Sequence, residues 1–356
     1  YNSLGEKQKA LDYYNQALPI ARQVGDRHGE AYILNKLRNI LDGGEVLAPT
    51  QQSNEAERLF MYGTELYKQG TAESLKEALN YLNQALPLFQ QVGDPIGKAS
   101  TLISIGKVYS ELGEKQKALD YLNQGLSLFQ QVGDPRMEAI TLTGIAYVYD
   151  NLGEKQKTVN YYQQALPIYQ QLGDHRMESE TLRSIGNVYY SLGEKQKTVN
   201  YYQQALPLFQ KMGDQGGEAS TLNNLGAVYS DLGETQKALN YLNKALPLFQ
   251  KMGDRSMEAN TLNVIGDVYN SLGETQKALN SLNQALSILQ EVGDRRREAT
   301  TLNNLGLVYD NLGEKQKALN LYNQALPLLR QIGDRRREAG TLNNFGLIYD
   351  SLGEKQ

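Results

Sequence analysis

Residues 181–194 read TLRSIGNVYYSLGE, and the same pattern returns every 40 residues along most of the chain. The Leu-Gly-Glu at its end recurs from Leu112 to Glu114 and then at each 40-residue step, as far as Leu352 to Glu354, without a slip. A fixed period of this length is typical of a solenoid, in which each unit contacts only its neighbours. In such proteins the function lies on a long surface rather than in one deep pocket, and such surfaces usually bind other molecules.

Each 40-residue unit is predicted to contain two α-helices. In one unit the first apolar stripe consists of Leu182, Ile185, Gly186 and Tyr189. Its spacing of three and four residues predicts a helix over 176–191, capped by Asp174 at its start and by Gly193 at its end. A second stripe of the same spacing predicts a helix over 195–212. The short turn between the two helices makes them antiparallel neighbours, so the expected fold is a stack of helical hairpins.

Composition excludes several classes of function. The chain has 356 residues, a formal net charge of -4 and no Cys, and its pI is near 5.5. A nucleic-acid partner is not expected, because phosphate binding needs a strongly basic face. No apolar stretch approaches membrane-spanning length and no signal peptide is visible, so no membrane partner is expected. Because a chain without Cys is compatible with a reducing compartment, we expect a cytoplasmic protein.

The recurring residues resemble the tetratricopeptide repeat (TPR) pattern. In one unit the matching positions are Leu222, Leu225, Gly226, Tyr229, Gly233, Ala238, Leu242 and Ala245. The usual TPR unit has about 34 residues and ends in a Pro, which is missing here at Gln250. The 40-residue spacing, the phrase TLNNLGLVY at 301–309 and the Gly-Asp-Arg connector are similar to kinesin light chains and LGN/Pins-type scaffolds. The resemblance implies an all-α, right-handed α-solenoid, or superhelix, that binds proteins and needs no cofactor.

The start of the chain is less regular than the rest. Residues 1–41 are expected to hold partial TPR-like helices, a second-type helix over 6–24 and another helix over 27–41. Residues 42–52 are then expected to form a polar linker. The main array is predicted over 53–356, as seven helix pairs followed by an unpaired first-type helix over 336–351. The two unpaired helices are complementary in type, which suggests head-to-tail self-association as an alternative role.

On the first helix of each unit, the stripe opposite the core is predicted to line a concave groove. Residues of this stripe vary between units while the core residues barely change, which is the best internal pointer to a ligand surface. The candidate peptide-binding residues are Lys107, Tyr147, Arg183, Asn187, Tyr190, Asn223, Asn263, Asp267, Arg296, Asn303, Leu307, Arg336, Asn343 and Leu347.

Asparagines in this stripe suggest two different kinds of contact. Asn223, Asn263, Asn303 and Asn343 are spaced one unit apart, and such a ladder of amides would clamp the backbone of an extended peptide, a role that asparagines on this stripe have in the resembling families. The alternative is that Asn is only tolerated on a wet helix face. The neighbouring Asn224, Asn304 and Asn344 are expected to bond to the adjacent unit.

Charged and apolar residues complete the expected groove. Arg296 and Arg336 start their helices while Asp310 and Asp350 end theirs, a polarity that would select a ligand of complementary charge. The alternative is that the Arg triplets at 295–297 and 335–337 are merely solvated. Tyr147 with Tyr190, and Leu307 with Leu347, are expected to form shallow pockets for apolar anchors, although single exposed apolar residues are also normal.

Nothing in the sequence supports catalysis. The two histidines, His28 and His175, are far apart and have no partner at motif spacing, and neither a phosphate loop nor a metal-binding His pair is present. We therefore predict a protein that is not an enzyme and has no catalytic or metal-binding residue. The predicted function is a scaffold that binds a protein or an extended peptide in the groove. A regulatory or sensory arm of a larger signalling protein is the alternative.

Overall fold

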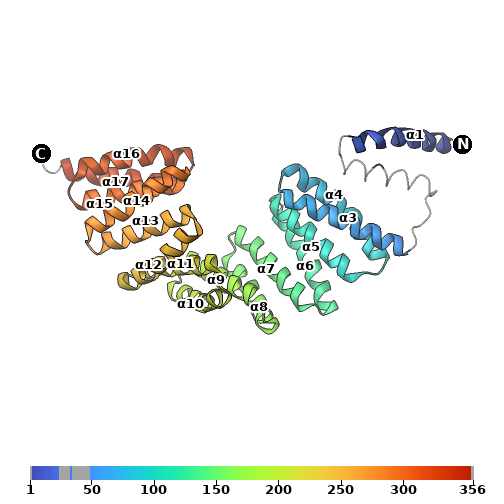
Figure 1. Cartoon of the computed structure of the whole chain (residues 1–356), viewed down its shortest axis with the longest axis horizontal. Coiled ribbons are helices and arrows are strands. Elements are labelled where there is room, and N and C mark those ends of the chain that lie inside the picture. Colours follow the sequence, from blue (N-terminus) through green and yellow to red (C-terminus); the bar gives the residue numbers. More distant parts are fainter. Residues whose placement is uncertain (1, 24–32, 34–48, 354–356) are drawn as a thin grey trace. The chain divides into compact units, whose positions relative to one another are not determined.

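The computed structural model describes residues 2–23, 33 and 49–353, and every element in these ranges is an α-helix. The chain divides into two compact units, Tyr1–Gly113 and Glu114–Gln356, and each is described here by itself. None of the described helices is both long enough and apolar enough to cross a membrane. The fold is an all-α solenoid of helical hairpins, as predicted (Figure 1).

The helices alternate between two types along the chain. The first helices of the array are α3 (Pro49–Gln69), α5 (Pro95–Glu111), α7 (Pro135–Asn151), α9 (His175–Ser191), α11 (Gln215–Asp231), α13 (Arg255–Ser271), α15 (Arg295–Asn311) and α17 (Arg335–Gly353). The second helices are α4 (Ala72–Gln91), α6 (Lys115–Val132), α8 (Lys155–Leu172), α10 (Lys195–Met212), α12 (Thr235–Met252), α14 (Thr275–Val292) and α16 (Lys315–Gln331).

The beginning of the chain differs in its bounds from the expectation. Helix α1 spans Asn2–Gln23, and α3 begins at Pro49, inside the stretch expected to be a linker. The helix expected over 27–41 lies outside the described residues except for Ile33, which packs against Ala21.

Helix ends in the array follow from one capping pattern. The Asp174 carboxylate accepts a hydrogen bond from the Met177 backbone N–H at 3.1 Å and so caps the start of α9. At its other end Gly193 adopts φ +75°, a left-handed conformation that costs Gly little. The backbone N–H of Glu194 then donates to the Tyr189 carbonyl at 2.9 Å, which closes the helix and starts the next one. The predicted caps are confirmed.

Close packing within a hairpin depends on one small residue of the first helix, which is Gly in α9, α11, α13 and α15 and Ala146 in α7. A Cβ added at Gly186 would lie 2.6 Å from the Tyr202 ring of the second helix, and one at Gly226 would lie 2.4 Å from Leu242. Gly266 and Gly306 face Leu282 and Tyr322 in the same way. A Cβ fits at these positions only if the facing side chain or the two helices shift.

The apolar core runs from one hairpin into the next. A single cluster joins Tyr202 of α10, Leu225 and Val228 of α11, Leu242 of α12, and Ile265 of α13. A hairpin alone would leave much of this surface in water, so the stability of the array comes largely from the interfaces between hairpins.

The recurring Tyr of the first helix is a packing residue. Tyr189 stacks on Tyr201 with ring centroids 5.5 Å apart, and the Lys197 ammonium lies 4.9 Å from the Tyr189 ring centroid. Lys197 is held in turn by Glu194 at 2.8 Å. The same Lys-over-Tyr arrangement occurs at Tyr149, Tyr229, Tyr269 and Tyr309.

Replacing Gly226 by Ala is expected to destabilise the array by about 1–3 kcal/mol, because the new methyl group overlaps Leu242. The measurement is urea unfolding followed by circular dichroism. Gly216→Ala is the matched control: its Cβ meets only the Asp214 side chain at 3.5 Å, and Ala favours the helix, so stability should stay the same or rise. Equal effects of the two substitutions would contradict the packing argument.

Candidate functional site

In the second unit, the first helices lie side by side on one face. Helix α9 packs on α11, α11 on α13, α13 on α15 and α15 on α17. In the part of this unit that the structure describes, no second helix packs against the next second helix in this way. First helices are therefore closer to one another than second helices are, which makes their common face the inner side of this unit.

A cleft of about 930 Å³ opens on this inner side. Its lining residues are Tyr190, Arg296, Ile332, Gly333, Asp334, Arg335, Arg336 and Arg337. Tyr190 belongs to α9, while the others come from the start of α15, the loop before α17 and the start of α17. The structure thus brings together three predicted site residues, Tyr190, Arg296 and Arg336. The loop residues Ile332 to Asp334 were missed, because the expected stripe was confined to the helices.

Tyr190 presents its ring to this cleft while its hydroxyl is held. The side chain is 41% exposed, and its O–H donates to Asp231 Oδ2 at 2.8 Å. Burial, together with this carboxylate, raises the pKa of the Tyr190 phenol to about 12, so the phenol stays neutral near pH 7. An exposed, immobilised aromatic ring is a suitable contact for an apolar or planar group of a ligand.

The arginines at the cleft divide into paired and unpaired ones. Arg295 and Arg335 pair with Glu298 and Glu338 at 2.8 and 2.7 Å, and Arg297 and Arg337 pair with Asp294 and Asp334 at 2.6 and 2.5 Å. The middle members, Arg296 and Arg336, are exposed and have no carboxylate within 4 Å among the described residues. Only these two guanidinium groups of the triplets are available for an anion.

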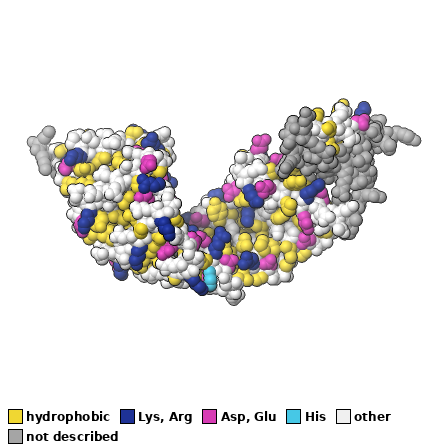
Figure 2. All heavy atoms as spheres, in the orientation of Figure 1, with side chains coloured by type: hydrophobic (Ala, Val, Ile, Leu, Met, Phe, Trp, Pro, Cys, Tyr) yellow, Lys and Arg dark blue, Asp and Glu magenta, His cyan; other side chains and the backbone are white. Residues whose placement is uncertain are grey.

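A smaller cleft shares Arg296 with the first. It has a volume of about 310 Å³ and is lined by Asn260, Asn263, Leu289, Arg296, Arg297, Thr300, Thr301 and Arg337. Figure 2 shows Lys and Arg side chains beside Asp and Glu side chains over α13 to α17. The surface is therefore locally patterned rather than uniformly basic.

The structure corrects the expected Asn ladder. Asn223 is buried, with only 4% of its surface exposed, and its Oδ1 accepts a hydrogen bond from the Thr261 hydroxyl of the next hairpin at 3.0 Å. Asn303 accepts from Thr341 in the same way at 3.0 Å. The expectation that Asn223 lies open in the groove is wrong, because the following hairpin covers this position. Asn263 is partly exposed, and only Asn343 of the four is fully exposed.

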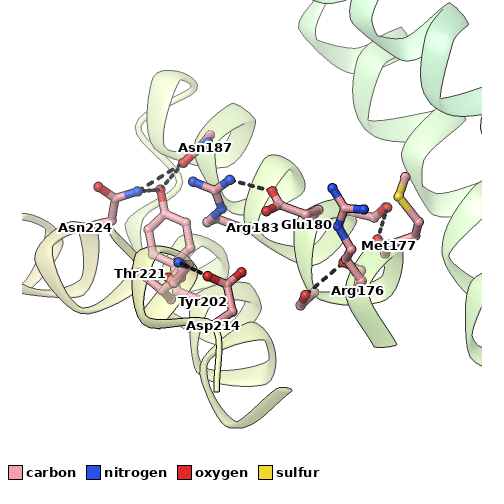
Figure 3. Close-up of polar contacts among 12 residues, drawn as sticks. Arg176, Met177, Glu180, Arg183, Asn187, Tyr202, Asp214, Thr221 and Asn224 are labelled. Atoms are coloured by element: carbon pink, nitrogen blue, oxygen red, sulfur yellow. Dashed lines mark hydrogen bonds and ion pairs between the residues drawn. The ribbon is translucent and has the colours of Figure 1, made fainter. Parts of the chain in front are cut away.

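Two of the three neighbouring asparagines, Asn224 and Asn304, bond to the adjacent hairpin, as predicted. Asn224 Nδ2 lies 3.4 Å from Asn187 Oδ1, which also accepts from the Tyr202 hydroxyl at 2.6 Å (Figure 3). Asn304 Nδ2 donates to Asn263 Oδ1 at 3.3 Å and to Asp267 Oδ2 at 2.9 Å.

Arg183 is committed within its own helix. Its guanidinium pairs with Glu180 (Figure 3) and lies over the Phe209 ring, 5.8 Å from the centroid. A ligand anion would therefore compete with Glu180 for this guanidinium.

The remaining candidates line neither cleft. Tyr147, Leu307 and Leu347 are exposed by 51%, 40% and 59%. Lys107 lies in the first unit, and partial desolvation lowers the pKa of its ammonium group.

Asp267 is the candidate whose environment is most unusual. Burial raises the pKa of its carboxyl group to about 7, against an ordinary value of 3.8, and the hydrogen bond from Asn304 only partly opposes this shift. The folded state thus holds a proton on Asp267 up to about pH 7, whereas the unfolded chain loses it near pH 4. Stability should therefore fall as pH rises from about 4 to 7 and carry a constant penalty above that.

Replacing Asp267 by Asn is expected to raise the Tm at pH 8 and to change it little near pH 4, because Asn needs no proton to be buried. Thermal unfolding at several pH values measures this. Asp120→Asn, at an exposed position on α6, removes one carboxylate from a solvated site and should show no such trend. A Tm difference between Asp267→Asn and the parent chain that is the same at pH 4 and pH 8 would contradict the assignment.

Several solved structures are similar to this chain in fold. No curated protein matches the chain. A solved structure of the apo form of RapI is similar, with a TM-score of 0.61 and 20% identity over 79% of this chain and 99% of RapI. A Rap protein complexed with competence and sporulation factor has a TM-score of 0.50 and 16% identity, over 93% of this chain and 99% of that one. A signal transduction ATPase with a TPR sensor, from Pyrococcus horikoshii, has a TM-score of 0.60 and 18% identity, over 94% of this chain and 55% of that one.

At these identities the likeness to solved structures is one of fold. A model of the family Anaphase-promoting complex subunit 5 matches residues 1–43. The model described as Tetratricopeptide repeat matches residues 71–131, 137–211, 199–251, 217–291 and 257–331, which together make up well over half of the sequence. The chain belongs to the tetratricopeptide repeat family.

Proposed function

We propose that this chain binds an extended polypeptide segment along the inner side of its first helices. The observation that carries the proposal is the cleft in which the exposed Tyr190 ring and the unpaired Arg296 and Arg336 guanidinium groups meet. Family and fold make the chain a protein-interaction or sensor array, and the cleft suggests where a partner would be held.

The chemistry of the cleft favours a segment that carries a carboxylate. A guanidinium group offers a planar fork of donors that matches a carboxylate in bidentate geometry. Because Arg296 and Arg336 form no ion pair with the described residues, a ligand would not have to break one of these to reach them. The Tyr190 ring beside them would cover an apolar part of the same segment.

Contacts outside the cleft would extend the bound segment. Asn263 and Asn343 retain accessible amide groups for backbone hydrogen bonds. Tyr147, Leu307 and Leu347 offer exposed apolar surface for anchor side chains. Asn223 and Asn303 are assigned to the packing of the array, since each is bonded to the Thr of the following hairpin.

The comparisons support a binding role for this fold. A Rap protein of similar fold was solved in complex with competence and sporulation factor. The structural match to the signal transduction ATPase with a TPR sensor covers 94% of this chain and 55% of the ATPase. The second candidate function is therefore a sensory arm in a larger signalling protein. The complete reading frame of the gene distinguishes the two, since a lone array would exclude the second.

Replacing both Arg296 and Arg336 by Ala should weaken the binding of acidic peptides by about tenfold or more, because charge-assisted hydrogen bonds are lost. The measurement uses an array of unstructured 15-residue peptides probed with the labelled chain. Lys244→Ala with Lys251→Ala is the matched control, since it removes two exposed cations from the second helix α12. Binding of acidic peptides that is the same for both double variants would exclude the cleft as their site.

Self-association through α17 is a separate prediction. On α17, Leu342 is 45% exposed, whereas its counterpart Leu302 on α15 is 2% exposed. A second-type helix, such as the one expected over 6–24 of another copy, would cover this surface. In sedimentation experiments on the 356-residue chain, the average particle mass is then expected to rise with protein concentration. The prediction is wrong if the mass stays that of the monomer at every concentration and Leu342→Ser does not change it.

A further inference from the structure

Asp267 occupies a register position at which the other repeats place different kinds of side chain. The residues at this register are Lys107, Tyr147, Asn187, Ala227, Asp267, Leu307 and Leu347. Five of the other six are exposed, and Ala227 is partly buried. Asp267 is the one acidic residue of the series, and it lies between Ala227 and Leu307 on the adjacent first helices α11 and α15.

The Asp267 carboxylate has less hydrogen bonding than it is able to accept. Its side chain is partly buried, and the contact that the structure gives it is the bond from Asn304 Nδ2 to Oδ2 at 2.9 Å. The same Asn304 amide also reaches Asn263 Oδ1 at 3.3 Å. An ionised carboxylate has two oxygens and about four lone-pair positions, so most of its accepting capacity remains unused. The oxygen Oδ1 is not among the buried atoms that lack a partner, so it is accessible to a donor that a ligand brings.

Several charged groups of the surrounding helices have other partners, and Arg296 on α15 forms no ion pair among the described residues. On α11, Asp231 accepts from Tyr190. On α12 and α14, Lys237 and Lys277 pair with the Glu three residues before each. On α15, the Asp310 carboxylate adds to the effect of burial in raising the pKa of the Tyr322 phenol on α16. No cation of these four helices, among the residues described, forms an ion pair with Asp267.

We propose that Asp267 recognises a basic side chain, Arg or Lys, of the segment that binds along the inner side. This inference rests on the proposed function and specifies its ligand further. A guanidinium or ammonium group would supply both the missing donors and the missing opposite charge. If Asp267 binds a basic residue while Arg296 and Arg336 bind an acidic one, the ligand segment carries both kinds of residue.

A pH dependence follows from this assignment. The neutral carboxyl group, which burial favours up to about pH 7, attracts a cation far less than the carboxylate does. Binding a cation therefore requires the loss of the proton. Affinity for the basic residue should rise by about tenfold in all between pH 6 and pH 8 and then level off.

Matched peptides test the proposal. Pairs of 12-residue peptides of varied sequence are synthesised with either Arg or citrulline at the central position, since citrulline has nearly the shape of Arg and no charge. Affinities are measured by fluorescence anisotropy at pH 6 and pH 8. For the pairs that bind, Arg is expected to exceed citrulline by about tenfold at pH 8, and by clearly less at pH 6.

Two variants assign this preference to one carboxylate. Asp267→Asn should reduce the Arg-to-citrulline ratio to below about twofold, and its melting curve verifies that the array is folded. Asp310→Asn removes a partly exposed carboxylate from the next first helix and should leave the ratio unchanged. Equal affinity for Arg and citrulline peptides, or a ratio that survives in Asp267→Asn, would overturn this inference alone. No binding of any peptide would overturn the proposed function and this inference with it.

Discussion

The close approach of two helices at a single small residue, which is Gly in most hairpins of the second unit, is the constraint on which the array depends. Gly226 leaves room for Leu242 of the second helix, and Gly186 and Gly306 do the same for the rings of Tyr202 and Tyr322. Because the hairpins share this geometry, each presents the same apolar surface to the next, and the core continues from hairpin to hairpin. The side-by-side packing of first helices in the second unit follows from this repetition.

Polar residues on the first helices have two different roles. Asn223 and Asn303 hold successive hairpins together through Thr261 and Thr341. Arg296, by contrast, forms no ion pair with the described residues, while the arginines on either side of it pair with Glu298 and with the capping Asp294. A surface that varies between repeats therefore mixes residues that specify the stack with residues left free for a partner.

The free groups of the second unit differ in charge along the inner side. Guanidinium groups that lack an internal partner meet at the cleft, and a desolvated carboxyl group lies on a neighbouring first helix. The exposed guanidinium groups cost the isolated protein little stability, and the desolvated carboxyl group costs it some. A ligand of opposite charge would stabilise each of them. This combination favours a partner selected by charge pattern rather than by hydrophobic area alone.

The sequence by itself determined the helices, their caps, the hairpin and the core. Asp174 and Gly193 mark helix ends through local hydrogen bonds and backbone conformation, and Leu182 and Tyr189 mark a buried face through their spacing, so neither needs distant information. Only the tertiary structure decided which stripe residues are open. Helical spacing gives the direction of Asn223 but not how far the next hairpin extends over it, and the pairing of Arg295 and Arg297 that leaves Arg296 free depends on side-chain positions in three dimensions.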